Sequence, residues 1–128
     1  MKKMILLFSH TLSESQKKQA KELYGVESFL SLPKKLQSIW SNISPELESV
    51  EEVMFPLKEF ISSNANRDDV ALIQGDFGGV YIMVNFCKEQ KIKTLYATTK
   101  REAIEYINEQ GEKMKKSKFE HVRFREYE

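Results

Sequence analysis

The sequence predicts a single α/β domain over residues 1–128, with a mainly parallel, Rossmann-like sheet flanked by helices. Two continuous apolar runs, at residues 5–8 and 70–73, have the length of strands that are buried on both faces. Segments with helical spacing separate the strand-like runs. At 128 residues, the chain can form one core but not two comfortable ones.

The first half of the chain gives a strand, a helix, a strand and further helices. Residues 3–8 form the first predicted strand. Ser13 and Gln16 have the spacing of a capping box, so a helix is predicted from Ser13 to about Tyr24, with Gly25 ending it. Residues 26–30 are predicted as a second strand. Pro33 suits the first position of a helix. Two helical pieces follow between residues 45 and 63, because Pro56 should restart the helix there.

The second half is predicted to contain three strands. After a polar loop, residues 70–73 are a buried strand, and a helix follows the glycine-rich turn up to about Glu89. Residues 92–97 are a further strand. Thr99 and Glu102 have capping-box spacing, so a helix is predicted from Thr99 to just before Gly111. Residues 118–127 are predicted as a last strand at the edge of the sheet.

Composition and charge exclude several functions. The net charge of +1 combines an acidic middle with basic ends: residues 41–69 carry two Lys or Arg against seven Asp or Glu. A binder of duplex nucleic acid would need a broad basic face. No apolar run reaches the roughly 20 residues of a membrane span. One cysteine and two histidines form neither a disulfide nor a metal-ligand pattern. We therefore expect a cytoplasmic protein without a metal or cofactor.

Polar residues gather where the predicted strands end. In open parallel sheets, ligands bind beyond the carboxyl ends of the strands. This rule selects three turns: Ser9-His10-Thr11, Gln74 to Gly79, and Tyr96 to Arg101. His10 lies just before a helix N-terminus, which favours anions, and its imidazole can donate or accept a proton near neutral pH. The alternative is a histidine that only satisfies the backbone of the turn.

The second and third turns offer groups for a sugar, a base or a phosphate. In Gly75-Asp76-Phe77-Gly78-Gly79, glycine allows close approach of a ligand, but the spacing matches neither a dinucleotide fingerprint nor a P-loop. Asp76 suits a ribose hydroxyl or an adenine amino group; an ordinary N-cap is the alternative. Thr98 and Thr99 supply hydroxyls, and Arg101 supplies a planar donor for phosphate, unless the cations form only a solvated face.

The C-terminal segment alternates basic and aromatic residues. His121, Arg123 and Arg125 lie between Phe119, Phe124 and Tyr127. Such a pattern can bind phosphate and stack on bases. It can equally be an edge strand whose charges prevent pairing with other chains.

Taken together, the motifs resemble the small CRISPR-associated proteins of type III systems, namely the Csx group numbered twenty, assigned as ring nucleases with the groups numbered fifteen and sixteen. The resemblance spans nearly the whole chain. It rests on the order and separation of the segments Leu6–Leu12, Leu32-Pro33 with Leu36-Gln37 and Trp40, Gln74–Gly78, Tyr96–Arg101 and Phe119–Tyr127.

This resemblance implies a homodimer with a fold related to CARF domains, which binds cyclic oligoadenylate and linearises it without a metal. His10 is then the first candidate acid or base, with Ser9 and Thr11 holding the scissile phosphate and His121 as a second candidate. Gln74, Asp76 and Thr98 would bind sugar or base, and Arg101, Arg123 and Arg125 would supply positive charge. A sensor that binds without cutting, an enzyme acting on mononucleotides and a purely structural dimer module are the alternatives.

Overall fold

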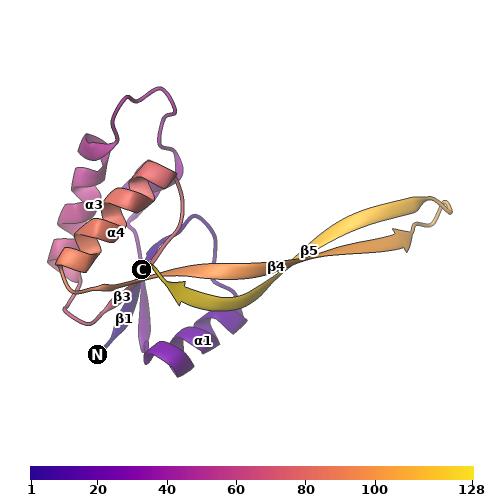
Figure 1. Cartoon of the computed structure of the whole chain (residues 1–128), viewed down its shortest axis with the longest axis horizontal. Helices are drawn as coiled ribbons and strands as arrows, with labels where there is room; N and C mark the ends of the chain where they lie inside the picture. The colour runs from indigo at the N-terminus through magenta and orange to yellow at the C-terminus, as the bar shows by residue number, and fades with distance from the viewer.

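The structure is a computed structural model that describes residues 1–128. It is one α/β domain, as predicted, with a five-stranded sheet in the order β2-β1-β3-β4-β5 (Figure 1). Neighbouring strands are parallel except β4 and β5, which form an antiparallel hairpin. The elements are β1 (Lys3–Leu7), α1 (Glu14–Tyr24), β2 (Ser28–Ser31), α2 (Lys34–Ser41), α3 (Glu51–Asn64), β3 (Val70–Ile73), α4 (Phe77–Glu89), β4 (Lys93–Ile107) and β5 (Lys113–Glu126).

Helices cover both faces of the sheet. On one face, α2, α3 and α4 pack on Ile5, Leu7, Ala71 and Ile73. On the other, α1 packs on alternate residues of the same strands, including Met4, Val70 and Leu72. Strands β1 and β3 therefore bury both faces, which explains their continuous apolar runs. None of the helices is both long enough and apolar enough to cross a lipid bilayer.

Several predicted boundaries are confirmed. The capping box at Ser13 forms, because the Ser13 hydroxyl accepts from the Gln16 N–H and the Gln16 side chain accepts from the Ser13 N–H. Gly25 ends α1 in the left-handed conformation, at φ 67°. Strand β3 and the edge strand β5 are present, and β2 lies within two residues of its predicted position.

Two helical predictions are wrong in detail. Residues 51–64 form one helix, α3, with Pro56 inside it, rather than two pieces. Met54, Leu57 and Ile61 are buried along α3, so packing of this apolar stripe compensates for the hydrogen bond that proline cannot make. Pro33 lies at the N-cap of α2, one position before the predicted first residue.

The largest difference concerns residues 99–111, where the predicted helix is absent. These residues continue β4, which pairs with β5 from Leu95↔Glu126 to Ile107↔Lys113. Gly111, predicted to end a helix, instead adopts φ 80° in the turn of the hairpin, and Asn108 caps that turn through its side chain. The long antiparallel ladder overrides the local capping-box pattern at Thr99 and Glu102.

Most of this hairpin projects from the body of the protein (Figure 1). Strand β3 pairs with β4 only as far as Leu95, so beyond this point β4 has β5 as its sole neighbour. We call residues 98–123 the arm. At roughly 3.3 Å per residue, ten residues of β4 in the arm extend about 30 Å. All side chains from Thr99 to Ile107 are exposed.

Candidate functional site at the carboxyl edge of the sheet

Two of the three predicted turns, those after β1 and β3, lie at one edge of the sheet. The third segment, Tyr96 to Arg101, is not a turn: it is the part of β4 that leaves the sheet here and enters the arm. We call this edge the carboxyl edge. Gln74, which follows β3, joins the other two strands: its N–H donates to the Leu7 carbonyl at 3.0 Å, and its side-chain oxygen accepts from the Ala97 N–H at 2.7 Å. The strand order reverses between β1 and β3. In open α/β sheets, this reversal is where ligands bind.

Trp40 of α2 closes one side of this edge. Its indole N–H donates to the Gln74 carbonyl at 3.0 Å, and its side chain is 2% exposed. A Cβ at Gly75 would lie 3.1 Å from the Trp40 ring. The close approach that Gly75 permits is thus to Trp40.

Asp76 caps α4, as the alternative interpretation predicted. One carboxylate oxygen, Oδ2, accepts from the Gly79 N–H at 3.0 Å. Asp76 and its neighbour Phe77 are exposed, and the Phe77 side chain is 95% exposed. Beside the first turn of α4, the carboxyl edge therefore presents a carboxylate and an uncovered aromatic ring.

A chain of hydroxyl and amide groups lies beside the end of β1. The Ser9 hydroxyl is 2.9 Å from that of Ser41, and the Gln37 amide donates both to Ser41 Oγ (2.9 Å) and to the Phe8 carbonyl (3.1 Å). His10 is exposed, with its ring edge-on to Phe8 at 5.4 Å between centroids. Gln37 and Ser41 were not predicted as site residues. Their spacing of four on a helix places them on one side of α2, but nothing local distinguishes them from solvated polar residues.

The threonines and arginines occupy the root and the length of the arm rather than a helix start. The Thr98 hydroxyl donates to the Arg123 carbonyl at 2.9 Å, next to a β-bulge between Thr98 and Thr99. Arg101 lies farther out, where its guanidinium donates to Ser117 Oγ and lies over the Phe119 ring. Arg101 is therefore not at the carboxyl edge, because the helix expected to hold it there does not form.

Arg125 lies closer to this edge, in a groove at the root of the hairpin. Its guanidinium is 5.2 Å from the centroid of Tyr96, which packs on Tyr127 at 4.8 Å. The Tyr127 hydroxyl donates to the Ile73 carbonyl at 2.6 Å, so the groove begins at the end of β3. Its volume is about 420 Å³, and Glu126 and Glu128 complete its lining.

His121 is held by α1 on the opposite face from α4. Gln19 Oε1 accepts both from His121 Nε2, at 2.9 Å, and from the Phe124 N–H, at 2.9 Å. Because this oxygen can only accept, Nε2 carries the proton and Nδ1 is the unprotonated nitrogen. Nδ1 is buried without a hydrogen-bond partner. Burial lowers the pKa of His121, so the ring favours its neutral form.

The structure therefore brings together part of the predicted set. Ser9 and His10 follow β1, and Gln74, Gly75 and Asp76 follow β3, so these five lie along the carboxyl edge, with Thr98 and Arg123 at the adjoining root of the arm. These groups can hydrogen-bond sugar hydroxyls and bases, and His10 can transfer a proton. No three His, Cys, Asp or Glu side chains form a group that could hold a metal ion.

These features define the class of protein: an α/β domain with a polar carboxyl edge and a projecting hairpin. The particular family follows from sequence. A family model described as "Uncharacterized protein MJ1673 family" matches residues 2–125, and the chain belongs to this family. It is 44% identical over 127 residues to "Uncharacterized protein MJ1673" of Methanocaldococcus jannaschii, covering 99% of this chain and 98% of that protein. No solved structure matches the chain. The resemblance to ring nucleases stays a prediction.

Proposed function

We propose that this protein binds cyclic oligoadenylate at the carboxyl edge and linearises it as a metal-independent ring nuclease. The single observation that carries the proposal is that Ser9 and His10 follow β1 while Gln74 and Asp76 follow β3, the two paired strands between which the strand order reverses. We likewise propose that the fold is Rossmann-like and related to CARF domains. The support is the strand order, together with helices on both faces of the sheet.

The proposed chemistry needs the reacting groups to be positioned and two proton transfers, one from the attacking 2′-hydroxyl and one to the leaving 5′-oxygen. The ribose 2′-oxygen attacks the adjacent phosphorus while its proton passes to a base, and the bond from phosphorus to the 5′-oxygen breaks. The leaving oxygen takes a proton, so the products end in a 2′,3′-cyclic phosphate and a 5′-hydroxyl. Alignment can contribute roughly 7–11 kcal/mol, and a positioned acid or base a further ~10²–10⁴-fold in rate.

Within this proposal, His10 is the base or acid, because it is exposed at the end of β1. Ser9 and the backbone before α1 hold the phosphate. Asp76 and Gln74 bind sugar or adenine, and the exposed ring of Phe77 offers a surface on which a base can stack. Arg123 and Arg125, at the root of the arm, supply positive charge.

One observation favours a second function, that of a sensor which binds the ring without cutting it. Of the two candidate histidines, His121 has Nε2 bonded to Gln19 and Nδ1 buried. Cleavage then depends on His10 alone, whereas binding requires neither histidine.

Incubation of the chain with cyclic tetra- and hexa-adenylate in EDTA, followed by chromatography of the products, tests the proposal. We expect linear products ending in a 2′,3′-cyclic phosphate. His10→Gln should slow cleavage at least about a hundredfold with little loss of binding, since a positioned acid or base gives ~10²–10⁴-fold. His121→Gln is the matched control and should retain cleavage. If the wild type binds the ligand but leaves it intact, the protein is a sensor and not a nuclease. If it does not bind the ligand, both functions are refuted.

A further inference from the structure

Beyond His121 and Val122, which Gln19 of α1 contacts, the arm has no layer packed against it in a single copy of the chain. An isolated two-stranded hairpin is at best marginally stable in water, and a stable ribbon needs another strand or a packed face. The arm nevertheless carries large apolar side chains that remain exposed, which are Ile104 (40%), Tyr106 (43%), Ile107 (70%), Met114 (37%) and Phe119 (66%). Such a surface is typical of an element that packs on a partner.

The outer end of one face of the arm is its most apolar part. Tyr106 and Met114 are directly opposed across the hairpin, and Ile104 lies two residues from Tyr106, on the same face. Four lysines lie beside this group on β5. Lys116, opposite Ile104, and Lys118 share its face, whereas Lys113 and Lys115 project from the other face. All four also lie on the free edge strand, where charge opposes edge-to-edge pairing. The apolar group lies on the face of the arm, so this face is the surface considered for packing.

The body of the protein carries a surface of matching character. The segment from Glu46 to Glu52 contains four glutamates and no basic residue. Beside it is a groove of about 200 Å³ with Ile39, Ile43, Leu47 and Val53 in its lining. The body thus pairs an apolar groove with glutamates, and the arm pairs an apolar group with lysines.

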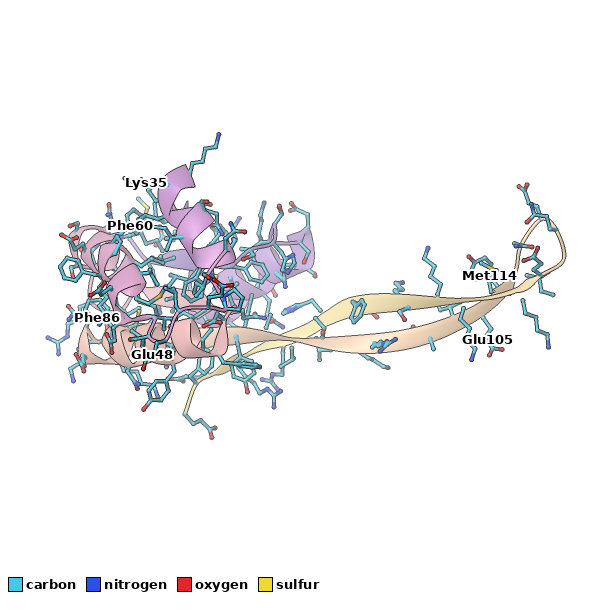
Figure 2. The ribbon with its side chains drawn as sticks, turned by 90° about the horizontal axis from the view of Figure 1, so that it is seen from above. Lys35, Glu48, Phe60, Phe86, Glu105 and Met114 are labelled. Carbon is cyan, nitrogen blue, oxygen red and sulfur yellow. The ribbon has the colours of Figure 1, made fainter.

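Most of these charges form no ion pair within the chain, although Lys115 and Lys118 lie opposite Glu105 and Glu102 in the hairpin ladder. None of the four lysines forms an ion pair, and among the four glutamates only Glu51 does, with Lys58 at 3.5 Å. The arm also points away from its own acidic segment. Glu48 lies on the body and Met114 near the far end of the arm (Figure 2). One copy cannot bring the two surfaces together in this conformation.

We propose that the arm of one copy docks on a second copy of this chain, with Ile104, Tyr106 and Met114 against the groove and Lys116 and Lys118 of the same face against segment 46–52. A two-fold axis makes the contact reciprocal, because each copy supplies one arm and one acidic segment. Each contact then needs to supply only half of the roughly 1,600 Å² that a stable complex buries.

This docking would extend the carboxyl edge, a consequence that rests on the proposed function although the interface does not. Next to the acidic segment, Val50 and Ile43 contact the first turn of α4: a Cβ at Gly78 would lie 3.3 Å from Val50, and one at Gly79 3.1 Å from Ile43. A docked arm therefore lies beside Asp76 and Phe77 of its partner and supplies a wall that one copy lacks.

The test is a charge exchange read by sedimentation velocity, with no nucleotide present. One variant changes Lys113, Lys115, Lys116 and Lys118 to Glu; the other changes Glu46, Glu48, Glu51 and Glu52 to Lys. We expect the wild type to be a dimer and each variant to be a monomer, with dissociation constants raised at least about a hundredfold by like-charge repulsion. An equimolar mixture of the variants restores both contacts and should form a heterodimer. Changing Lys17, Lys18, Lys21 and Lys88 to Glu is the control, which should stay dimeric.

Three outcomes would overturn the inference: a monomeric wild type at high micromolar concentration, a dimer that survives both reversals, or a mixture that stays monomeric. Thermal melts show whether each variant is folded, and both sets of positions are on the surface. Single-stranded RNA is included as a probe. If it binds the monomeric wild type and not the lysine variant, the arm is a nucleic-acid contact. Because no cleavage is measured, this result is independent of that for His10.

Discussion

Gln19 is predicted to hold the root of the arm onto the body, and its removal should cost more than the loss of an ordinary surface glutamine. Its side chain makes three hydrogen bonds to β5. Oε1 accepts from the Phe124 N–H and from His121 Nε2, each at 2.9 Å, and the amide donates to the Val122 carbonyl at 3.3 Å. In Gln19→Ala, these three groups lose their partner on α1.

The magnitude follows from the number of bonds and their exposure. A hydrogen bond contributes about 0.5–1.5 kcal/mol net, which gives a range of roughly 1.5–4.5 kcal/mol for three bonds. The Val122 carbonyl can be solvated, whereas Phe124 is buried at the base of the hairpin. We therefore expect a loss of about 2–3 kcal/mol in the free energy of unfolding, in the middle of this range.

Urea denaturation gives this free energy, and hydrogen exchange of the Phe124 amide reports the local effect. Gln90→Ala is the matched control, because the Gln90 side chain makes no hydrogen bond in the structure, and it should change stability by less than about 0.5 kcal/mol. Equal stabilities of the two variants, or an unchanged exchange rate at Phe124, would refute the role given to Gln19.

Gln19→Glu tests the same contact through pH. In the wild type, burial lowers the pKa of His121 below its usual value of 6.5. The unfolded state then binds a proton first, so stability falls as pH drops through 6.5 toward the folded pKa. A carboxylate at position 19 would raise the folded pKa, and its contribution would be present at low pH and lost as pH rises through that pKa. If the slope of the free energy of unfolding against pH has the same sign in Gln19→Glu as in the wild type between pH 5 and 8, the contact between residue 19 and His121 is contradicted.

Three further predictions concern the body. Gly75→Ala should destabilise the protein by about 1–3 kcal/mol in urea denaturation, because its Cβ would lie 3.1 Å from the Trp40 ring; an unchanged midpoint would contradict this packing. Burial would raise the pKa of Asp69, but hydrogen bonds from the Asn66 N–H and from Lys3 outweigh it and lower the pKa. Its contribution is therefore present above pH 3.8 and lost as pH falls through the folded pKa. Asp69→Asn should reduce this loss of stability at acid pH, measured by urea denaturation. If the loss is unchanged in the variant, other carboxylates cause it. Burial raises the pKa of the Cys87 thiol to about 12, so a disulfide reagent at pH 8 should react only after unfolding; rapid reaction of the folded chain would contradict the burial.

Local patterns predicted the body of the fold well. Apolar runs identified β1 and β3, since a strand buried on both faces needs no alternation. The capping box at Ser13 was correct, and an equivalent pattern at Thr99 was wrong. Both patterns offer the same local hydrogen bonds. The difference is non-local: after Thr99 the chain has a second strand to pair with, while after Ser13 the amphipathic helix has a sheet face to cover.

The candidate site shows the same limit. The carboxyl-edge rule selected the turns at Ser9 and Gln74 because it depends only on strand direction. It could not identify Gln37, Ser41 or Trp40, which reach this edge from α2. The sequence does not fix how a helix such as α2 is aligned with the strand ends. Which of its side chains reach the carboxyl edge is therefore decided by tertiary packing.

The arm explains why the predicted cations lie at different places along the hairpin rather than at one site. A helix after Thr99 would have kept Arg101 at the edge; a strand carries Arg101 away at roughly 3.3 Å per residue and leaves Arg125 near Tyr96. Positive charge is thus divided between the root of the hairpin and an outer surface. Gln19 fixes the root from α1, so the direction of the arm depends on bonds that include the one to His121. Protonation of His121 would place a proton on Nδ1, which has no acceptor, and should weaken the hold on the arm.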